Sequence, residues 1–182
     1  MTLRLTLGFD PGFTGAIAVL ADGEPVLMRD IPVHSVPSPT QDKPDRTKRE
    51  INPFRLSMVL RDVLRAHPGA DVLAVLEDVS VMPADSKVAG FRFGESLGAL
   101  KGVLGSLGIR WTTVRAQAWK KHHGLIGTQK DAARLMVLQR WPSQGIAFTQ
   151  KRDIGRADAV LIARWAFDTE AHAGPYLVPR RA

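Results

Sequence analysis

The chain has 182 residues, of which 45% are hydrophobic and 24% charged, a composition that is typical of a globular domain and excludes a wholly disordered chain. The absence of cysteine excludes disulfides, thiolate metal sites and cysteine nucleophiles. The 25 Lys and Arg residues exceed the 18 Asp and Glu residues, for a net charge of +7, which favours a polyanionic partner, nucleic acid first, over a basic surface that is only solvated. Because the chain has neither a secretory leader nor an apolar run long enough to cross a bilayer, we expect a cytoplasmic protein without a membrane segment.

The N-terminal part of the chain has the pattern of three antiparallel strands. Residues 3–10 alternate between apolar and polar side chains, the period of a strand. A second apolar run over residues 16–20 follows Pro11-Gly12, and Asp22-Gly23 is a hairpin signal before residues 24–33. Residues 34–50 are rich in proline and mixed charges, which predicts a mobile surface loop, basic and Pro-rich.

Helices and strands then alternate. Asn52 and Pro53 are typical of an N-cap followed by a first-turn proline, and predict a helix that ends near residue 66. Apolar runs predict strands over residues 71–76 and 109–114, the first of them buried on both faces. Further helices are expected over residues 91–107, 117–122, 129–141 and 156–170, with a loop over 142–155. The order predicts a single α/β domain over residues 1–170, with a mixed five-stranded sheet, helices on both faces and a loose basic tail over 171–182.

Three carboxylates occupy positions where a charge is costly to bury. Asp10 ends the first strand, Glu77 ends the strand over 71–76, and Asp158 falls within the apolar arc of the last helix. Each has a structural alternative: a turn cap for Asp10, an exposed strand end for Glu77, and a buried arginine partner for Asp158. Taken together, clustered carboxylates without Cys or paired His suit Mg²⁺ or Mn²⁺, and two such ions support phosphodiester hydrolysis.

Two further patterns carry open alternatives. Lys120-Lys121-His122-His123 is a basic cluster at the end of a short helix, which either holds phosphates or is a solvated charge run. Gly94, Gly98 and Gly102 recur every four residues on the helix over 91–107. This smooth face either packs on the chain's own sheet or meets another helix.

Five segments resemble, in order, those of RuvC-family Holliday-junction resolvases, with the small RuvC-like members carried by phages most similar. They are GFDPGFTGAIAVL, AVLEDVSVMP, FRFGESLGALKGVLGSLGI, RAQAWKKHHG and GRADAVLIARWA. The resemblance covers residues 3–167. It implies an RNase H-like fold and a homodimer in which each subunit cuts one strand of a four-way DNA junction, leaving a 5′-phosphate and a 3′-hydroxyl.

The resemblance also implies roles for particular residues. The catalytic and metal-binding acids would be Asp10, Glu77 and Asp158, which would hold two Mg²⁺ ions, with Mn²⁺ as a substitute. Either Lys120 or Lys121, together with Lys130, would match the lysines that family members use near the active cleft, with Lys130 as a catalytic residue. We expect the DNA contacts to come from Lys120, Lys121, Lys130, Arg152 and Arg156. The family often has a fourth acid or a histidine three residues before the last Asp, where this chain has Gly155. Either Asp153 is the fourth ligand, from the loop, or the second metal is held more loosely.

Two other functions are weighed against the nuclease. One is a branched-DNA binding protein that has lost catalysis, although unneutralised acids in the cleft would repel DNA. The other is an ATP-binding domain of the actin and sugar-kinase type, because residues 10–14 fit the Asp-x-Gly-x-Thr pattern of its phosphate loop. A single domain and a charge of +7 argue against the second.

Overall fold

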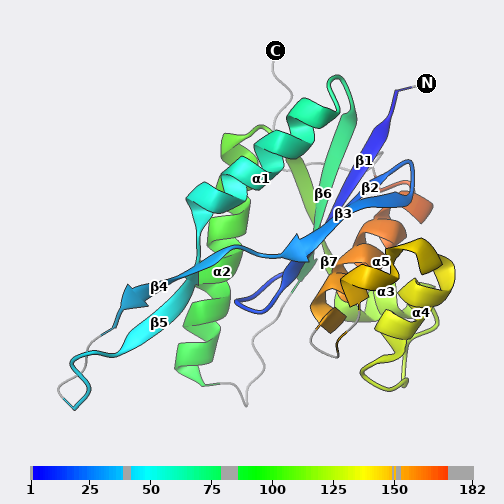
Figure 1. The fold of residues 1–182 in the computed structure, drawn as a ribbon. Coiled ribbons are helices and arrows are strands. Elements are labelled where there is room, and N and C mark those ends of the chain that lie inside the picture. The colour runs from blue at the N-terminus through cyan, green and yellow to red at the C-terminus, as the bar shows by residue number, and fades with distance from the viewer. Residues whose placement is uncertain (1, 39–41, 79–85, 149, 151–152, 172–182) are drawn as a thin grey trace.

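A computed structural model describes residues 2–38, 42–78, 86–148, 150 and 153–171, and its centre is a five-stranded sheet with the strand order β3-β2-β1-β6-β7 (Figure 1). The strands are β1 (Arg4–Asp10), β2 (Ala16–Ala21), β3 (Glu24–Asp30), β6 (Asp71–Asp78) and β7 (Arg110–Arg115). β1 pairs antiparallel with β2, and β2 with β3, whereas β6 runs parallel to both β1 and β7. The predicted α/β class, with a mixed five-stranded sheet and three antiparallel N-terminal strands, is confirmed.

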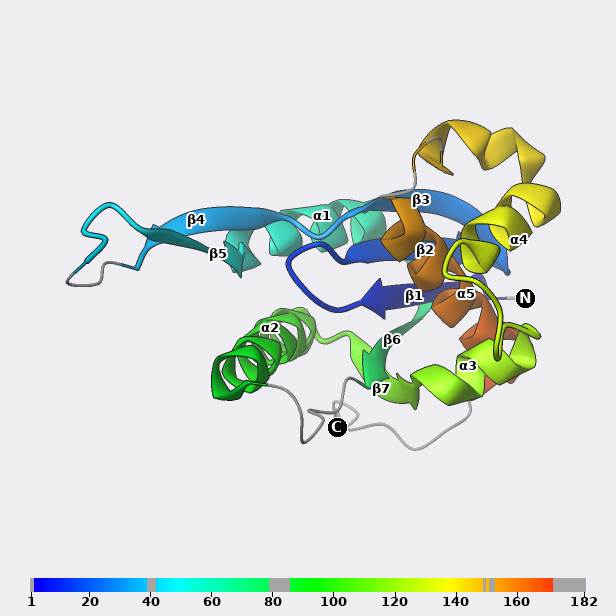
Figure 2. The same ribbon diagram turned by 90° about the horizontal axis from the view of Figure 1, so that it is seen from below.

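Helices cover both faces of the sheet (Figure 2). One face packs against α1 (Pro53–Ala66) and α2 (Lys87–Ser106), and the other against α3 (Ala116–His122), α4 (Ala132–Arg140) and α5 (Ile154–Asp168). The side chain of Asn52 accepts a hydrogen bond from the Arg55 N–H, which confirms the predicted start of α1. α2 begins earlier than predicted, because the Ser86 side chain caps it by accepting a hydrogen bond from the Ala89 N–H.

The residues of β6 alternate between the two hydrophobic cores. Leu73 and Val75 belong to the core under α5, and Ala74 and Leu76 to the core under α1 and α2. All four are fully buried, so the prediction that this strand is buried on both faces is confirmed. The same alternation decides which face each strand-ending carboxylate points to.

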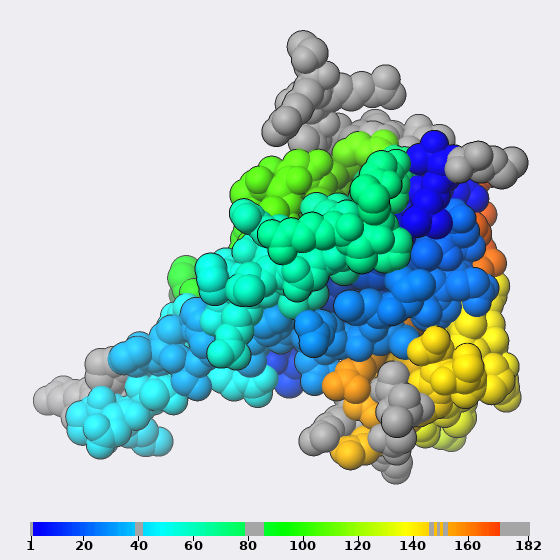
Figure 3. Space-filling view, turned by 45° about the horizontal axis from the view of Figure 1, so that its top comes forward, coloured from blue at the N-terminus to red at the C-terminus, as the bar shows by residue number. Residues whose placement is uncertain are grey.

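The segment expected as a loop over residues 34–50 instead contains a two-stranded hairpin, formed by β4 (Val33–Pro37) and β5 (Thr47–Ile51). The hairpin projects from the body of the molecule (Figure 3). At its base, Arg49 donates a hydrogen bond to the Phe13 carbonyl oxygen at 2.5 Å, and Lys48 pairs with Glu95 of α2 at 3.6 Å. These contacts are long-range, so local composition did not reveal them.

Other boundaries shift by a few residues. The helix expected from residue 129 begins at Ala132, and the expected loop over 142–155 contains a 3₁₀-helix, η1 (Pro142–Phe148). α5 begins at Ile154, two residues before the predicted start. Across the described part of the chain, no helix combines the length and the hydrophobicity that a membrane crossing requires.

Gly8 lets α5 lie directly on β1. A β-carbon at Gly8 would overlap the Ala159 carbonyl oxygen and lie 2.6 Å from the Ala163 nitrogen. Any side chain at this position would therefore push α5 away from the centre of the sheet. Gly8 is thus required by the packing of α5 on β1.

We predict that Gly8→Ala lowers the free energy of unfolding by about 1–3 kcal/mol, as overpacked cores do. Gly105→Ala is the matched control, because a β-carbon there meets nothing within 4 Å and alanine favours a helix over glycine by up to about 1 kcal/mol. Urea unfolding followed by circular dichroism measures both variants. Equal stability of the two variants would contradict the close approach of α5.

Candidate active site

The parallel pairing of β1 with β6 places Asp10 beside Glu77. Phe9 lies opposite Leu76 in this register, and both side chains belong to the core under α1 and α2. The next residue on each strand therefore points to the opposite face, toward α5. Two carboxylates from strands 67 residues apart in sequence thus meet at one edge of the sheet.

The first turns of α5 complete this group. Asp158 directly precedes Ala159, whose carbonyl oxygen lies against Gly8, so the helix carries the third carboxylate over the sheet edge. Gly155 lies in the same turns, and a β-carbon there would be 2.9 Å from Asp10 Oδ2. The carboxylate of Asp10 therefore takes the space that an acid or a histidine at position 155 would need.

The three acids influence one another's ionisation. Burial raises the pKa of Asp10 to about 8, and the negative charges of Asp158 and Glu77 contribute to the rise. Burial also raises the pKa of Asp158 to about 6, with Glu77 adding to the rise. The pKa of Glu77 is raised by burial too. The positive charge of Lys120 opposes all three shifts, so the acids and this lysine form one electrostatic unit.

A pocket of about 170 Å³ opens beside the acids. Asp158, Lys120 and Lys130 line it, together with Trp119, Leu125, Thr128, Gln129, Ala133 and Ile154. The positive charge of Lys130 lowers the pKa of Asp158. Of the two adjacent lysines on α3, Lys120 is therefore the one that faces the cleft, while Lys121 is exposed.

Trp119 contacts the acidic group directly. Its indole Nε1–H donates a hydrogen bond to Glu77 Oε1 at 3.3 Å, which opposes the rise in the pKa of Glu77. The side chain is fully buried, as its apolar-periodic position predicts. The sequence gives no sign of the carboxylate partner, because the partner lies on another strand.

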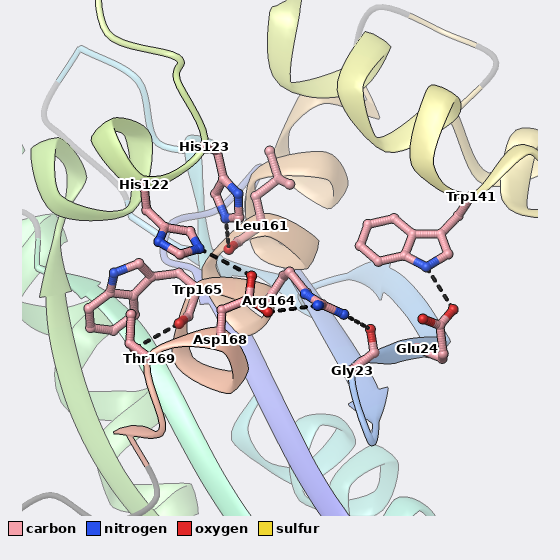
Figure 4. A network of polar contacts seen from close by, with 10 residues as sticks. All are labelled: Gly23, Glu24, His122, His123, Trp141, Leu161, Arg164, Trp165, Asp168 and Thr169. Carbon is pink, nitrogen blue, oxygen red and sulfur yellow. Dashed lines mark hydrogen bonds and ion pairs between the residues drawn. The ribbon is translucent and has the colours of Figure 1, made fainter.

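A polar network holds α3 against α5 (Figure 4). His122 Nε2 lies 3.1 Å from Asp168 Oδ2, and His123 Nε2 lies 2.8 Å from the Leu161 carbonyl oxygen. Arg164 joins the network by pairing with Asp168 at 2.7 Å and donating to the Gly23 carbonyl oxygen. Burial would raise the pKa of Asp168, but the hydrogen bonds from Arg164 and His122 hold it below its usual value. The network fixes the helix that carries Trp119 and Lys120 relative to the helix that carries Asp158.

Asp153 and Arg156 lie at the start of α5 and have other partners. Asp153 is buried, accepts a hydrogen bond from the Gln150 N–H at 2.8 Å, and lies 3.5 Å from Arg156 Nη1. Arg156 pairs with Asp30 of β3 through two hydrogen bonds, at 2.7 and 3.0 Å. The structure thus engages Asp153 outside the group formed by the three acids. Arg152 lies outside the described residues.

The donor atoms of the three acids suit a hard divalent cation. Asp10, Glu77 and Asp158 offer only carboxylate oxygens, the ligands that Mg²⁺ and Mn²⁺ prefer. Burial and mutual repulsion make the ionised carboxylates unfavourable in free energy. A bound cation would offset this cost, because its positive charge stabilises the ionised form of each carboxylate. Within the described residues, no three acidic or histidine side chains are already arranged to hold one ion, so a cation would have to draw these carboxylates together.

Known proteins resemble the chain in sequence and in fold. No family model matches it. A segment of 87 residues, 47% of this chain, is 33% identical to the Holliday junction resolvase MOC1, chloroplastic, of Chlamydomonas reinhardtii. The chain spans only about 10% of the length of that curated relative.

Two solved structures of RuvC from Thermus thermophilus, one of them in complex with a Holliday junction substrate, have the same fold. Their TM-scores are 0.56 and 0.53 at 17% sequence identity, and they cover 96% of this chain and 99% and 100% of their own. This likeness confirms the predicted RNase H-like fold; that the chain is of the phage type stays a prediction. The chain thus shares the fold of RuvC, and 87 of its residues match a Holliday junction resolvase in sequence.

Proposed function

We propose that the protein is a metal-dependent, structure-selective endodeoxyribonuclease that resolves Holliday junctions or other branched DNA, leaving a 5′-phosphate and a 3′-hydroxyl. The observation that carries the proposal is the group of three buried carboxylates that Asp10, Glu77 and Asp158 form beside Lys120. The charges of Asp158 and Glu77 raise the pKa of Asp10, and the charge of Glu77 raises that of Asp158. The net charge of +7 and the names of the related proteins support DNA as the substrate. A cytoplasmic location stays a prediction.

The acids would hold the cation. We assign Asp10, Glu77 and Asp158 as ligands of Mg²⁺, with Mn²⁺ as a substitute and two ions per site. When bound, such ions supply Lewis-acid activation of water and stabilisation of the leaving oxygen. We leave Asp153 out of the ligand set, because its oxygens already bind the Gln150 N–H and Arg156.

The lysines of the cleft would act on the phosphate. Lys120 and Lys130 line the pocket with Asp158, so their charges can offset the negative charge that develops on the phosphate during cleavage. Lys121 is exposed beside them and can bind a neighbouring backbone phosphate without reading sequence. Arg156 joins α5 to β3 through Asp30, so we give it a lesser part in DNA binding than the lysines; Arg152 keeps its proposed DNA contact.

We further propose a homodimer formed through α2. Gly94, Gly98 and Gly102 lie on an exposed face of this helix, and a β-carbon at any of them would meet nothing within 4 Å. The alternative, that these glycines pack on the chain's own sheet, is therefore wrong. Val88 and Phe91 extend the face and are 61% and 70% exposed. An apolar, smooth face of this kind fits a second copy of the same helix.

Asp10→Asn tests the nuclease. Asparagine keeps the shape of the side chain but removes its charge, so we expect cleavage of a labelled four-way junction in Mg²⁺ to fall by about 100-fold or more, while junction binding is retained. Asp62→Asn is the matched control, because Asp62 is 70% exposed on α1. Each variant is assayed on the junction and on a linear duplex of the same sequence, with Mg²⁺ and with EDTA.

The same assay separates the alternatives. Junction binding by the wild type without any cut, in Mg²⁺ or Mn²⁺, would support the catalytically silent binder. Tight ATP binding without junction binding would support the actin and sugar-kinase type. Undiminished cleavage by Asp10→Asn would overturn the assignment of the acids.

The raised pKa of Asp10 predicts that the metal-free protein loses stability as pH rises. The folded state keeps a proton on Asp10 up to a pKa of about 8, whereas the unfolded state releases it near 3.8. The unfolded state therefore binds fewer protons between these pH values, and stability falls across the interval. In EDTA, we expect Asp10→Asn to be more stable than the wild type at pH 8, by about 2–5 kcal/mol, and the difference to shrink toward pH 5. Urea unfolding at both pH values measures this, and a gap that does not change with pH would contradict the buried acid.

Gly98→Arg tests the dimer. A long charged side chain on the smooth face of α2 would block the approach of a second helix, so we expect a monomer by sedimentation at micromolar concentration. Leu135→Arg is the control, because Leu135 is an exposed apolar residue of α4, 49% exposed, on the opposite side of the sheet. A monomeric wild type would overturn the homodimer, and a dimeric Gly98→Arg variant would show that the interface lies elsewhere.

A further inference from the structure

The indole of Trp119 contacts Glu77, one of the three acids of the candidate site. The indole cannot itself be a ligand of the cation. Its Nε1–H is a donor only, it lies 3.3 Å from Glu77 Oε1, and the side chain is fully buried. The bond therefore occupies one carboxylate oxygen of Glu77 and leaves Oε2 for another partner.

We propose that Trp119 is a positioning residue, which orients Glu77 so that its second oxygen faces the cation held by the acidic group. The inference rests on the proposed function and deepens it. Partners of this kind, which hold a metal ligand through a hydrogen bond, commonly change metal affinity or activity by about 10–100-fold when they are removed.

The surroundings of Trp119 make its indole a rigid anchor. The ring packs in the core under α5, and Lys120 Nζ lies 5.1 Å from the ring centre. His122 and His123, which follow on the same short helix, bind α5 at Asp168 and at the Leu161 carbonyl oxygen. These contacts hold the C-terminal end of the helix against α5 and limit the movement of the indole.

The indole also borders the pocket that Asp158 and Lys130 line. One side chain thus contacts Glu77 of β6 and forms part of the wall facing Asp158 of α5. Trp119 is therefore placed to fix the carboxylate of Glu77 next to the pocket that Asp158 lines.

A second tryptophan in the same protein provides a matched comparison. Trp141 is 6% exposed, and its Nε1–H donates to Glu24 Oε2 at 2.8 Å (Figure 4). Trp119→Phe and Trp141→Phe each remove an indole N–H that donates to a glutamate from a buried ring. Only Trp119→Phe removes a hydrogen bond to the acidic group.

The test measures Mn²⁺ binding to the DNA-free full-length protein by electron paramagnetic resonance. We expect Trp119→Phe to weaken Mn²⁺ binding by about 10–100-fold, and Trp141→Phe to bind Mn²⁺ as the wild type does. Junction binding in EDTA should be the same for all three proteins, because the indole does not contact the DNA-binding lysines through its N–H. Equal Mn²⁺ affinity in the two folded variants would overturn the proposal.

A measurement on the wild type covers the case in which Trp119→Phe fails to fold. The chain has four tryptophans, so its ¹⁵N spectrum holds four indole N–H signals, and Glu77→Gln shifts the one that belongs to Trp119. Substoichiometric Mn²⁺ should broaden that signal before the signal of Trp141, which Trp141→Phe identifies. Broadening of the Trp141 signal first, or of both equally, would contradict the position of the indole beside the cation.

The outcomes for the two proposals are distinct. A wild type that binds no Mn²⁺ and cuts no junction removes the nuclease proposal and this inference with it. A wild type that binds Mn²⁺ and cuts, with a Trp119→Phe variant that behaves like Trp141→Phe, removes only the role of Trp119.

Discussion

The contact between α5 and β1 is the constraint on which the candidate site depends. It requires glycine at Gly8, where the backbone of α5 lies on the strand. At Gly155 the first turn of α5 lies against the carboxylate of Asp10, and a β-carbon there would be 2.9 Å from Asp10 Oδ2. With any larger side chain at Gly8, the helix would move outward and take Asp158 away from the strand-ending acids. Close packing of backbone on backbone is therefore what assembles three charges that repel one another.

This assembly is costly, and α3 offsets part of the cost. Desolvation and mutual repulsion raise the pKa of Asp10 and of Asp158, so the ionised group opposes folding. Lys120 supplies the opposing charge and Trp119 a hydrogen bond to Glu77. The short helix that carries both residues is held to α5 by His122 and His123. The site thus holds three carboxylates that repel one another next to a helix that is fixed to α5. Such an arrangement is expected where a bound cation neutralises the carboxylates.

The two faces of the sheet differ in function: one carries the candidate active site, and the other carries the helix proposed to contact a second subunit. The face under α5 carries the acids, the lysines and the pocket between them. The face under α1 and α2 supplies a second core, and beyond it α2 exposes its row of glycines. Chemistry and the proposed contact with a second subunit therefore lie on opposite sides of one sheet, so that neither requires a compromise in the packing of the other.

Local patterns in the sequence were enough to predict the class of the fold, the mixed sheet, the cap of α1 at Asn52 and the three acids as candidate ligands. Each of these depends on residues close in sequence: the period of a strand, a cap and its first turn, or a charge within an apolar run. Only the tertiary structure decided the rest. It formed the hairpin of β4 and β5 and joined it to Phe13 and Glu95, turned Lys120 toward the cleft in preference to Lys121, gave Asp153 other partners, and set the indole of Trp119 against Glu77. The contacts with Phe13, Glu95 and Glu77 join segments distant along the chain, whereas Asp153 contacts Gln150 and Arg156, three residues away on either side. Packing and electrostatics in three dimensions decide both kinds of contact, and no pattern of composition or periodicity records them.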